Sequence, residues 1–323
     1  MFEHHPVKHP KELEELKRQE VAQQTKAQVK AASVKGKRGK NLDIAPDAQV
    51  SEEARIGDGA HIGAGSMITG NADIGSGVKI GKNVKIYPGV KLAPGVEVAD
   101  GATLMPGAKV GAYGKIGAGT VLGDKVEVGA KSTIGAGSSV AAEDKIGDGA
   151  SVGANSIIRR EVNVGAGCLI GSGCTIEDKA KIGKKAVIGA NSEIGKSAEV
   201  GERAELGLKV HVGRGTSIGE EAKIGKESTV GDACRIGKKV RMGPGVVMAT
   251  EAKVDASATI YARAKIGKGA MVGEGGKLRE AAELAPGVLL EGHAESLAEE
   301  KLGLPDELDT RPVYTSRIRK LSI

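Results

Sequence analysis

The sequence predicts an all-β solenoid, built from short strands and sharp corners over most of its length. An aliphatic residue recurs every six residues from Ile44 to Leu290, so residues 44–295 divide into 42 hexads without an insertion. A small residue usually occupies the fifth place of each hexad. The chain has 50 Gly but one Phe, four Tyr and no Trp, and since aromatic side chains normally fill a globular core, this core must be narrow.

The N-terminal extension, residues 1–43, precedes the repeat. Its segment LEELKRQEVAQQTKAQVKAA is rich in good helix formers, so we expect this extension to be partly helical. Residues 26–40 contain six basic residues and no acid. A solvated lead-in is the simplest interpretation of this run. The alternative is a docking segment for an anionic partner, formed by Lys35, Lys37, Arg38 and Lys40.

Each hexad of residues 44–295 reads as one short strand and one turn. Side chains alternate faces along a strand, so places five and one point inward and place six, between them, points outward. Gly, Asn and Asp at places two to four permit the positive φ of a sharp corner. Three hexads close one triangular coil and bring residue i beside residue i+18. The 42 hexads therefore predict about 14 coils.

The hexads IGKKAV, IGANSE, IGKSAE and VGERAE illustrate the pattern [LIV]-G-x-x-[STAV]-x. This pattern resembles that of the bacterial hexapeptide-repeat transferase superfamily. The resemblance implies a left-handed parallel β-helix, a hand that general crossover rules would not favour. It also implies homotrimers packed side by side. The superfamily's enzymes are acyltransferases, which take the acyl group from acyl-CoA or acyl carrier protein and commonly use a His as general base.

One hexad, VAAEDK, places Asp144 at an inward fifth place, with Val126 and Val162 as its neighbours one coil away. Because a buried unpaired carboxylate is costly, we favour a local change of corner that turns Asp144 outward. The alternative is a buried acid with a perturbed pKa. The three cysteines also occupy fifth places, which predicts reduced, buried thiols and a cytoplasmic location. They are Cys168, Cys174 and Cys234.

The outward residues at place six form three faces, each followed every 18 residues. We call them the first, second and third face, which begin with Gln49, Arg55 and His61. The second face is mostly charged. The first and third faces carry adjoining uncharged sections in the middle coils, which predict a homo-oligomer interface, with a trimer favoured by the resemblance. The predicted interface residues are Thr103, Val121, Ser139, Ile157, Thr175, Thr133, Ser151, Leu169 and Val187. The alternative is a flat polar face with scattered apolar residues.

His211 is the best candidate for catalysis. It points outward from the first face with Glu193 one coil below, where a carboxylate would orient an imidazole base. His61 has Lys79 beside it and no evident acid. Superfamily enzymes usually carry a loop inserted between hexads, and these 42 hexads contain none. We expect no bound cofactor and no metal site, because no set of His or Cys converges. A non-enzymatic, self-associating scaffold or binding protein is therefore favoured, with a hexapeptide-class acyltransferase as the alternative.

The C-terminal region, residues 296–323, follows a last stretch, LREAAEL, that fits either a coil or a helix. SLAEEKLGL predicts a short amphipathic helix. A solenoid end needs covering, so the tail is either a cap or a docking sequence for a protein partner, through Tyr314, Ile318 and Leu321. No run approaches 18 apolar residues and the first residues lack an apolar core, so we expect neither a transmembrane helix nor a signal peptide.

Overall fold

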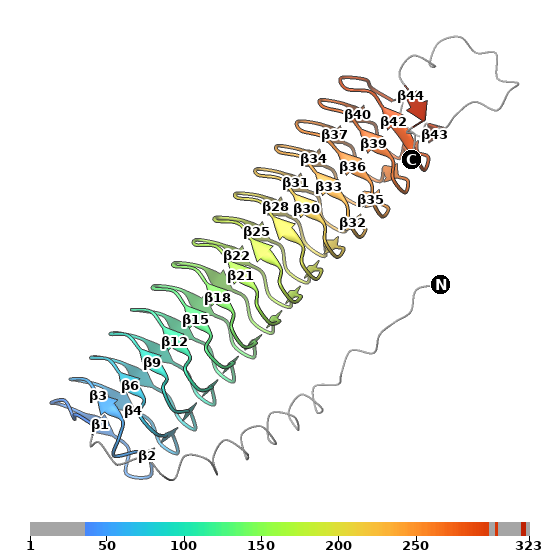
Figure 1. Ribbon diagram of the computed structural model, residues 1–323. Coiled ribbons are helices and arrows are strands. Elements are labelled where there is room, and N and C mark those ends of the chain that lie inside the picture. The colour runs from blue at the N-terminus through green and yellow to red at the C-terminus, as the bar shows by residue number, and fades with distance from the viewer. Residues whose placement is uncertain (1–35, 297–300, 303–317, 321–323) are drawn as a thin grey trace, which may run out of the picture. The chain divides into compact units, whose positions relative to one another are not determined.

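The computed structural model describes residues 36–296, 301–302 and 318–320, which wind into a left-handed parallel β-helix of about 14 turns (Figure 1). The strands from β1 (Asp43–Ile44) to β41 (Glu283–Leu284) are two residues long and begin six residues apart. The remaining strands are β42 (Val288–Leu290), β43 (Lys301–Leu302) and β44 (Ile318–Lys320). The described part of the chain contains no α-helix, so the predicted fold class is confirmed.

Every third strand belongs to the same sheet, so the coils have three flat sides. The third face is the sheet from β1 to β40, the first face runs from β2 to β41 and ends on β43, and the second runs from β3 to β42 and ends on β44. Neighbouring strands of successive coils are parallel and pair residue i with residue i+18, as Ile44 pairs with Ile62. The predicted ladder spacing is therefore confirmed.

The core is a single column of side chains from hexad places one and five. From Ala54 to Leu290 these side chains are buried, whereas place six is exposed or half-buried. Small polar residues fit place five because their hydroxyls bond to the backbone of the next coil. Ser138 Oγ donates to the carbonyl of Gly153 at 3.0 Å and accepts the N–H of Ser156 at 3.2 Å.

The corners use glycine for two different purposes. Positive φ occurs almost entirely at place four, where Gly137 has φ 67° and Lys131 has φ 57°. Glycine at place two has no positive φ, but a Cβ on Gly147 would lie 2.5 Å from the backbone nitrogen of Ala166 in the next coil. Glycine at place two therefore allows coils to approach closely. The expectation that it serves a positive φ was wrong.

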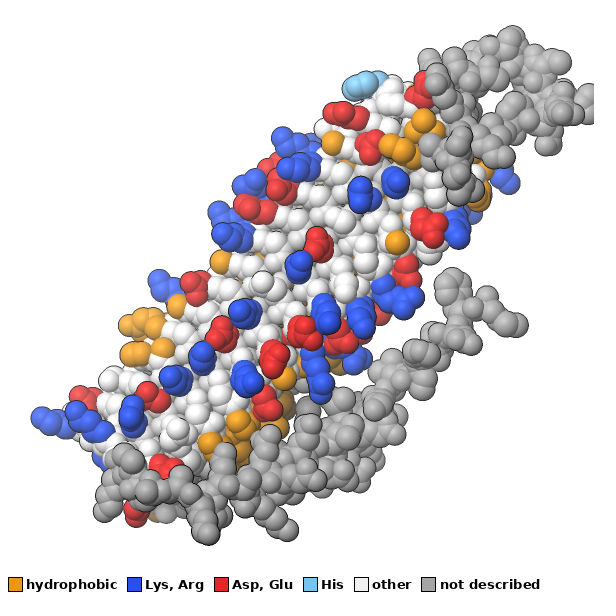
Figure 2. Space-filling model, in the orientation of Figure 1, with side chains coloured by type: hydrophobic (Ala, Val, Ile, Leu, Met, Phe, Trp, Pro, Cys, Tyr) orange, Lys and Arg blue, Asp and Glu red, His pale blue; other side chains and the backbone are white. Residues whose placement is uncertain are grey.

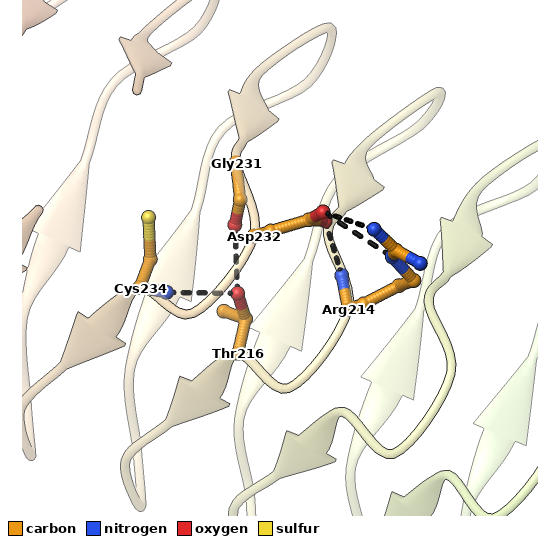
Figure 3. Close-up of polar contacts among 5 residues, drawn as sticks. All are labelled: Arg214, Thr216, Gly231, Asp232 and Cys234. Carbon is orange, nitrogen blue, oxygen red and sulfur yellow. Dashed lines mark hydrogen bonds and ion pairs between the residues drawn. The ribbon is translucent and has the colours of Figure 1, made fainter. Parts of the chain in front are cut away.

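Polar corner residues also tie one coil to the next, as Figure 3 shows near Asp232. The Asp232 carboxylate accepts the backbone N–H of Arg214 at 2.6 Å and its guanidinium at 3.2 Å. Thr216 Oγ1 donates to the carbonyl of Gly231 at 2.7 Å and accepts the N–H of Cys234 at 3.1 Å. These bonds satisfy backbone groups that the two-residue strands leave over.

The solenoid begins earlier than the predicted boundary at residue 44. Arg38 bridges to Ile56 in parallel, the backbone N–H of Lys40 donates to Asp58 Oδ1 at 2.7 Å, and the N–H of Gly59 donates to the carbonyl of Lys40. Arg38 Nη2 donates to the carbonyl of Ser51 at 2.9 Å. Three of the residues predicted for anion docking, Lys37, Arg38 and Lys40, thus belong to the first coil.

The C-terminal end also differs from expectation. The LREAAEL stretch forms coil, since Leu278 ends β40 (Lys277–Leu278) and Leu284 ends β41. Lys301 and Leu302, expected in a short helix, form β43 parallel to β41, and β44 pairs antiparallel with β42, Ile318 opposite Leu290. Unpaired strand edges favour such pairing. Ile318 therefore contributes its backbone to the chain's own cap. Lys35, Tyr314, Leu321 and the predicted helix over 11–32 lie outside the described residues.

Candidate functional sites

The uncharged sections of the first and third faces carry three large exposed apolar side chains. Ile157 is 45% exposed on the first face, and Leu169 and Val187 are 51% and 36% exposed on the third. Leu169 and Val187 are ladder neighbours, in β22 (Leu169–Ile170) and β25 (Val187–Ile188). Val121, also predicted there, is half-buried. Apolar side chains held at this exposure make the area the best candidate for a protein contact.

We call these nine residues the neutral strip, as predicted: Thr103, Val121, Ser139, Ile157, Thr175, Thr133, Ser151, Leu169 and Val187. The corners that join its two faces are also uncharged. Residues 135–138, 153–156, 171–174 and 189–192 read GAGS, GANS, GSGC and GANS. Corners of such small residues leave both faces accessible to a flat partner. The structure places the strip at the surface and contains no partner chain.

The second face is charged as predicted, and its charges pair along the ladders. Lys109 Nζ lies 2.8 Å from Glu127, and Lys181 Nζ lies 2.8 Å from Glu199. The hydrogen bond and charge of Lys109 hold the pKa of the Glu127 carboxyl below its ordinary value. Figure 2 shows such basic and acidic side chains interspersed over the visible side of the coils. Exposed pairs of this kind contribute little stability, but they oppose a flat apolar contact.

His211 and Glu193 meet as the sequence predicted. They pair in β29 (His211–Val212) and β26 (Glu193–Ile194), with His211 Nδ1 3.1 Å from Glu193 Oε2. Both side chains are about half exposed. The carboxylate fixes one ring nitrogen and leaves Nε2 directed to solvent, an arrangement that suits a general base.

His61 has the same arrangement, contrary to expectation. Its Nδ1 lies 2.7 Å from Asp43 Oδ2, because Asp43 stands 18 residues earlier and extends the ladder by one coil. The expectation that His61 lacks an acid neighbour was wrong, since the face was counted only from the first full hexad. An acid one coil below an outward histidine therefore occurs twice in the described residues.

Asp144 is fully buried, so the favoured outward interpretation was wrong. Its Oδ1 accepts the N–H of Val162 at 2.8 Å, and its Oδ2 has no partner among the described residues. Burial raises the pKa of the Asp144 carboxyl to about 8 against the opposing hydrogen bonds of Val162 and Ala141. The carbonyl of Asp144 accepts the N–H of Glu127, and Lys145 donates to Val162. Turning Asp144 outward would break this ladder, so the carboxyl follows the backbone inward.

The cysteines are free and buried, as predicted. Burial raises the pKa of all three thiols, that of Cys234 to about 11. Such thiols are poor nucleophiles, and their positions inside the core give them a packing role. The described residues contain no group of three or more His, Cys, Asp and Glu suited to a metal ion. Nor do they include a helix long and apolar enough to cross a membrane.

Two family models match the chain. Residues 77–112 match the model described as bacterial transferase hexapeptide (six repeats). Residues 54–94, 145–178 and 179–207 match the model described as hexapeptide repeat of succinyl-transferase. A search of curated proteins found no match.

Several solved structures share the fold. The acetyltransferase domain of PglB from Neisseria gonorrhoeae, in complex with acetyl coenzyme A, is 26% identical over 43% of this chain and 63% of that domain, with a TM-score of 0.34. A hexapeptide transferase family protein from Anaplasma phagocytophilum is 20% identical over 42% of this chain and 80% of its own, with a TM-score of 0.35. The Arabidopsis UDP-N-acetylglucosamine acyltransferase is 16% identical over 78% of this chain and 71% of its own, with a TM-score of 0.33. The chain thus spans less than two thirds of the PglB domain.

Proposed function

The chain belongs to the bacterial hexapeptide-repeat superfamily, and we propose that it acts as a non-enzymatic scaffold that self-associates through the neutral strip. The observation that carries this proposal is the exposure of Ile157, Leu169 and Val187 on two adjoining faces. The hexad register also runs without interruption from the first coil to Ser296, which keeps both faces flat. A flat surface of this kind fits a second copy of itself.

We propose a trimer, in which the strip of each subunit packs beside that of the next. Complete burial of a large aliphatic side chain contributes about 1.5–3 kcal/mol, so three half-exposed residues per subunit supply several kcal/mol per contact. The ion pairs of the second face, such as Lys109 with Glu127, would then remain in solvent. The three buried thiols support a reducing, cytoplasmic compartment, which is part of this proposal.

The test is the mass in solution of a variant with Ile157→Lys and Leu169→Lys. Both side chains are exposed in the single chain, so the substitutions leave the core intact. Lysines buried in a contact are costly, and we expect sedimentation to show one third of the native mass. Asn163→Lys, on the exposed second face, is the matched control and should keep the native mass. An unchanged mass in the double variant would refute the strip as the contact.

A second candidate function is acyl transfer, and the observation that favours it is the 3.1 Å contact between His211 and Glu193. Here His211 Nε2 would remove a proton from a hydroxyl or amine acceptor while Glu193 holds the ring. The donor would be acyl-CoA or acyl carrier protein. We expect His211→Ala to abolish acyl transfer with the fold intact. His61→Ala, which breaks the equivalent pair with Asp43, is the control and should retain activity. Normal turnover by the His211 variant would exclude this assignment.

A further inference from the structure

The first coil, residues 36–53, differs from all later coils in the exposure of its core. Its inward side chains are only half-buried, whereas the inward side chains from Ala54 to Leu290 are buried. The half-buried residues are Leu42, Ile44, Ala48 and Val50. The cross-section of the core is therefore partly open to solvent at this end of the described solenoid.

The strands of the first coil also have an unpaired edge. β1 pairs with β4 (His61–Ile62) and β2 (Gln49–Val50) pairs with β5 (Met67–Ile68), and neither has a second neighbour in residues 36–296, 301–302 and 318–320. In later coils the N–H of place one donates to the preceding coil, as Ile56 donates to the carbonyl of Lys37. The same N–H groups of Ile44 and Val50 face the open edge. A strand edge with exposed N–H and C=O groups is a site for another strand.

The opposite end is closed by the chain itself. β43 extends the first face, the backbone of Glu295 bridges to Lys277, and β44 covers β42 in the antiparallel direction. The last inward residues of the coils, Leu290 and Ala294, are 1% and 9% exposed. Because β44 reverses the strand direction, it cannot continue the parallel ladder into another solenoid. A head-to-tail fibre of stacked coils is therefore disfavoured.

Charge divides the first coil into two parts. The segment from Gly36 to Asn41 is purely basic and the segment from Asp43 to Glu53 is purely acidic. The charged residues are Lys37, Arg38 and Lys40 in the first segment, and Asp43, Asp47, Glu52 and Glu53 in the second. Rotation of a second copy by a two-fold axis in the plane of the end brings basic residues of one copy toward acidic residues of the other.

We propose that the first coil binds the first coil of a second copy, head to head, through its open strand edges and half-buried aliphatic residues. This contact is separate from the lateral one proposed above and does not depend on it. A two-fold contact is closed, so it doubles the assembly once and stops. A strand edge is satisfied best by another strand edge, which the second copy supplies in the antiparallel direction.

The test compares Val50→Lys with Ala285→Lys in the full chain. Val50 is inward at the open end, and an inward charge is a known block to edge pairing. Ala285 is a half-buried residue near the closed end and serves as the matched control. We expect Val50→Lys to halve the mass measured by sedimentation and to halve the particle length in electron micrographs. The control should change neither.

A second variant separates edge pairing from local unfolding. Val50→Pro removes only the N–H that faces the open edge and keeps an apolar side chain. It should also halve the mass, while hydrogen exchange of residues 61–104 stays as in the native chain. A native mass in both Val50 variants would overturn the proposal, as would native particles one solenoid long. The latter would assign the cover of this end to the chain's own residues. Loss of the lateral contact instead changes the mass threefold, so the two failures are distinguishable.

Discussion

Replacing Asp144 with asparagine should stabilise the middle coils increasingly as pH rises from 4 to 8. Asparagine keeps an oxygen that accepts the N–H of Val162, but it cannot ionise. The native carboxyl has an ordinary pKa of 3.8 and a folded pKa of about 8, because burial disfavours its charged form. Between these values the folded chain holds a proton that the unfolded chain has lost.

The magnitude follows from this difference in bound protons. Stability falls by about 1.4 kcal/mol per pH unit where the unfolded state binds one proton fewer. The contribution of Asp144 is complete below pH 3.8, where both states are protonated, and it is lost as pH rises toward 8. We therefore expect the advantage of Asp144→Asn to grow by roughly 4 kcal/mol between pH 4 and pH 7.

Hydrogen exchange of residues 141–164 is the suitable assay, because solenoids open locally and overall unfolding need not be two-state. Opening free energies are compared after correction for the intrinsic exchange rate at each pH. Ser138→Ala is the control, since it removes the hydroxyl that donates to Gly153 and should cost the same at every pH. An advantage of Asp144→Asn that is equal at pH 5 and pH 8 would refute the burial argument.

Three further predictions concern the corners, the thiols and the ladders. Gly119→Ala, at φ 64° with open space around it, should cost about 1 kcal/mol in thermal unfolding, whereas Gly147→Ala should cost about 2–3 kcal/mol because its Cβ meets backbone; equal costs would contradict the two roles of glycine. Alkylation followed by mass spectrometry should modify Cys234 and the other two thiols only after unfolding, because they are buried; rapid labelling of the native chain would exclude this. Lys109→Ala should raise the pKa of the Glu127 carboxyl in an NMR titration while changing stability by less than about 1 kcal/mol, and an unchanged pKa would show that the pair does not form in solution.

The fold could be predicted because a period of six without insertions determines every inward position. Each residue inherits its place from the repeat, so the pairing of Ile44 with Ile62 follows from counting alone. The ends could not be predicted in this way, because β43 and β44 lie outside the hexads. Their pairing depends on which strand edges the last coils leave open. The role of glycine at place two was missed because sequence does not show how closely successive coils approach.

The candidate sites were predictable where they depend on the ladder. The contact of His211 with Glu193 follows from their separation of 18 residues, and so does that of His61 with Asp43 once the first coil is included. Asp144 was misjudged because its desolvation was weighed without the backbone bonds on both sides. Those bonds hold the corner in the common path and carry the carboxyl into the core. One unfavourable side chain is not enough to divert a regular ladder.

The register of 18 residues restricts how such a chain changes in length during evolution. Removing or duplicating 18 residues would take out or add one whole coil and leave every downstream side chain on its original face. A change of six residues would preserve the alternation of inward and outward positions, and hence the core, yet it would rotate the downstream surface by one side of the triangle. Ile157 would then no longer share an edge with Leu169. Selection on surface function should therefore preserve multiples of three hexads, even though stability alone would accept single ones.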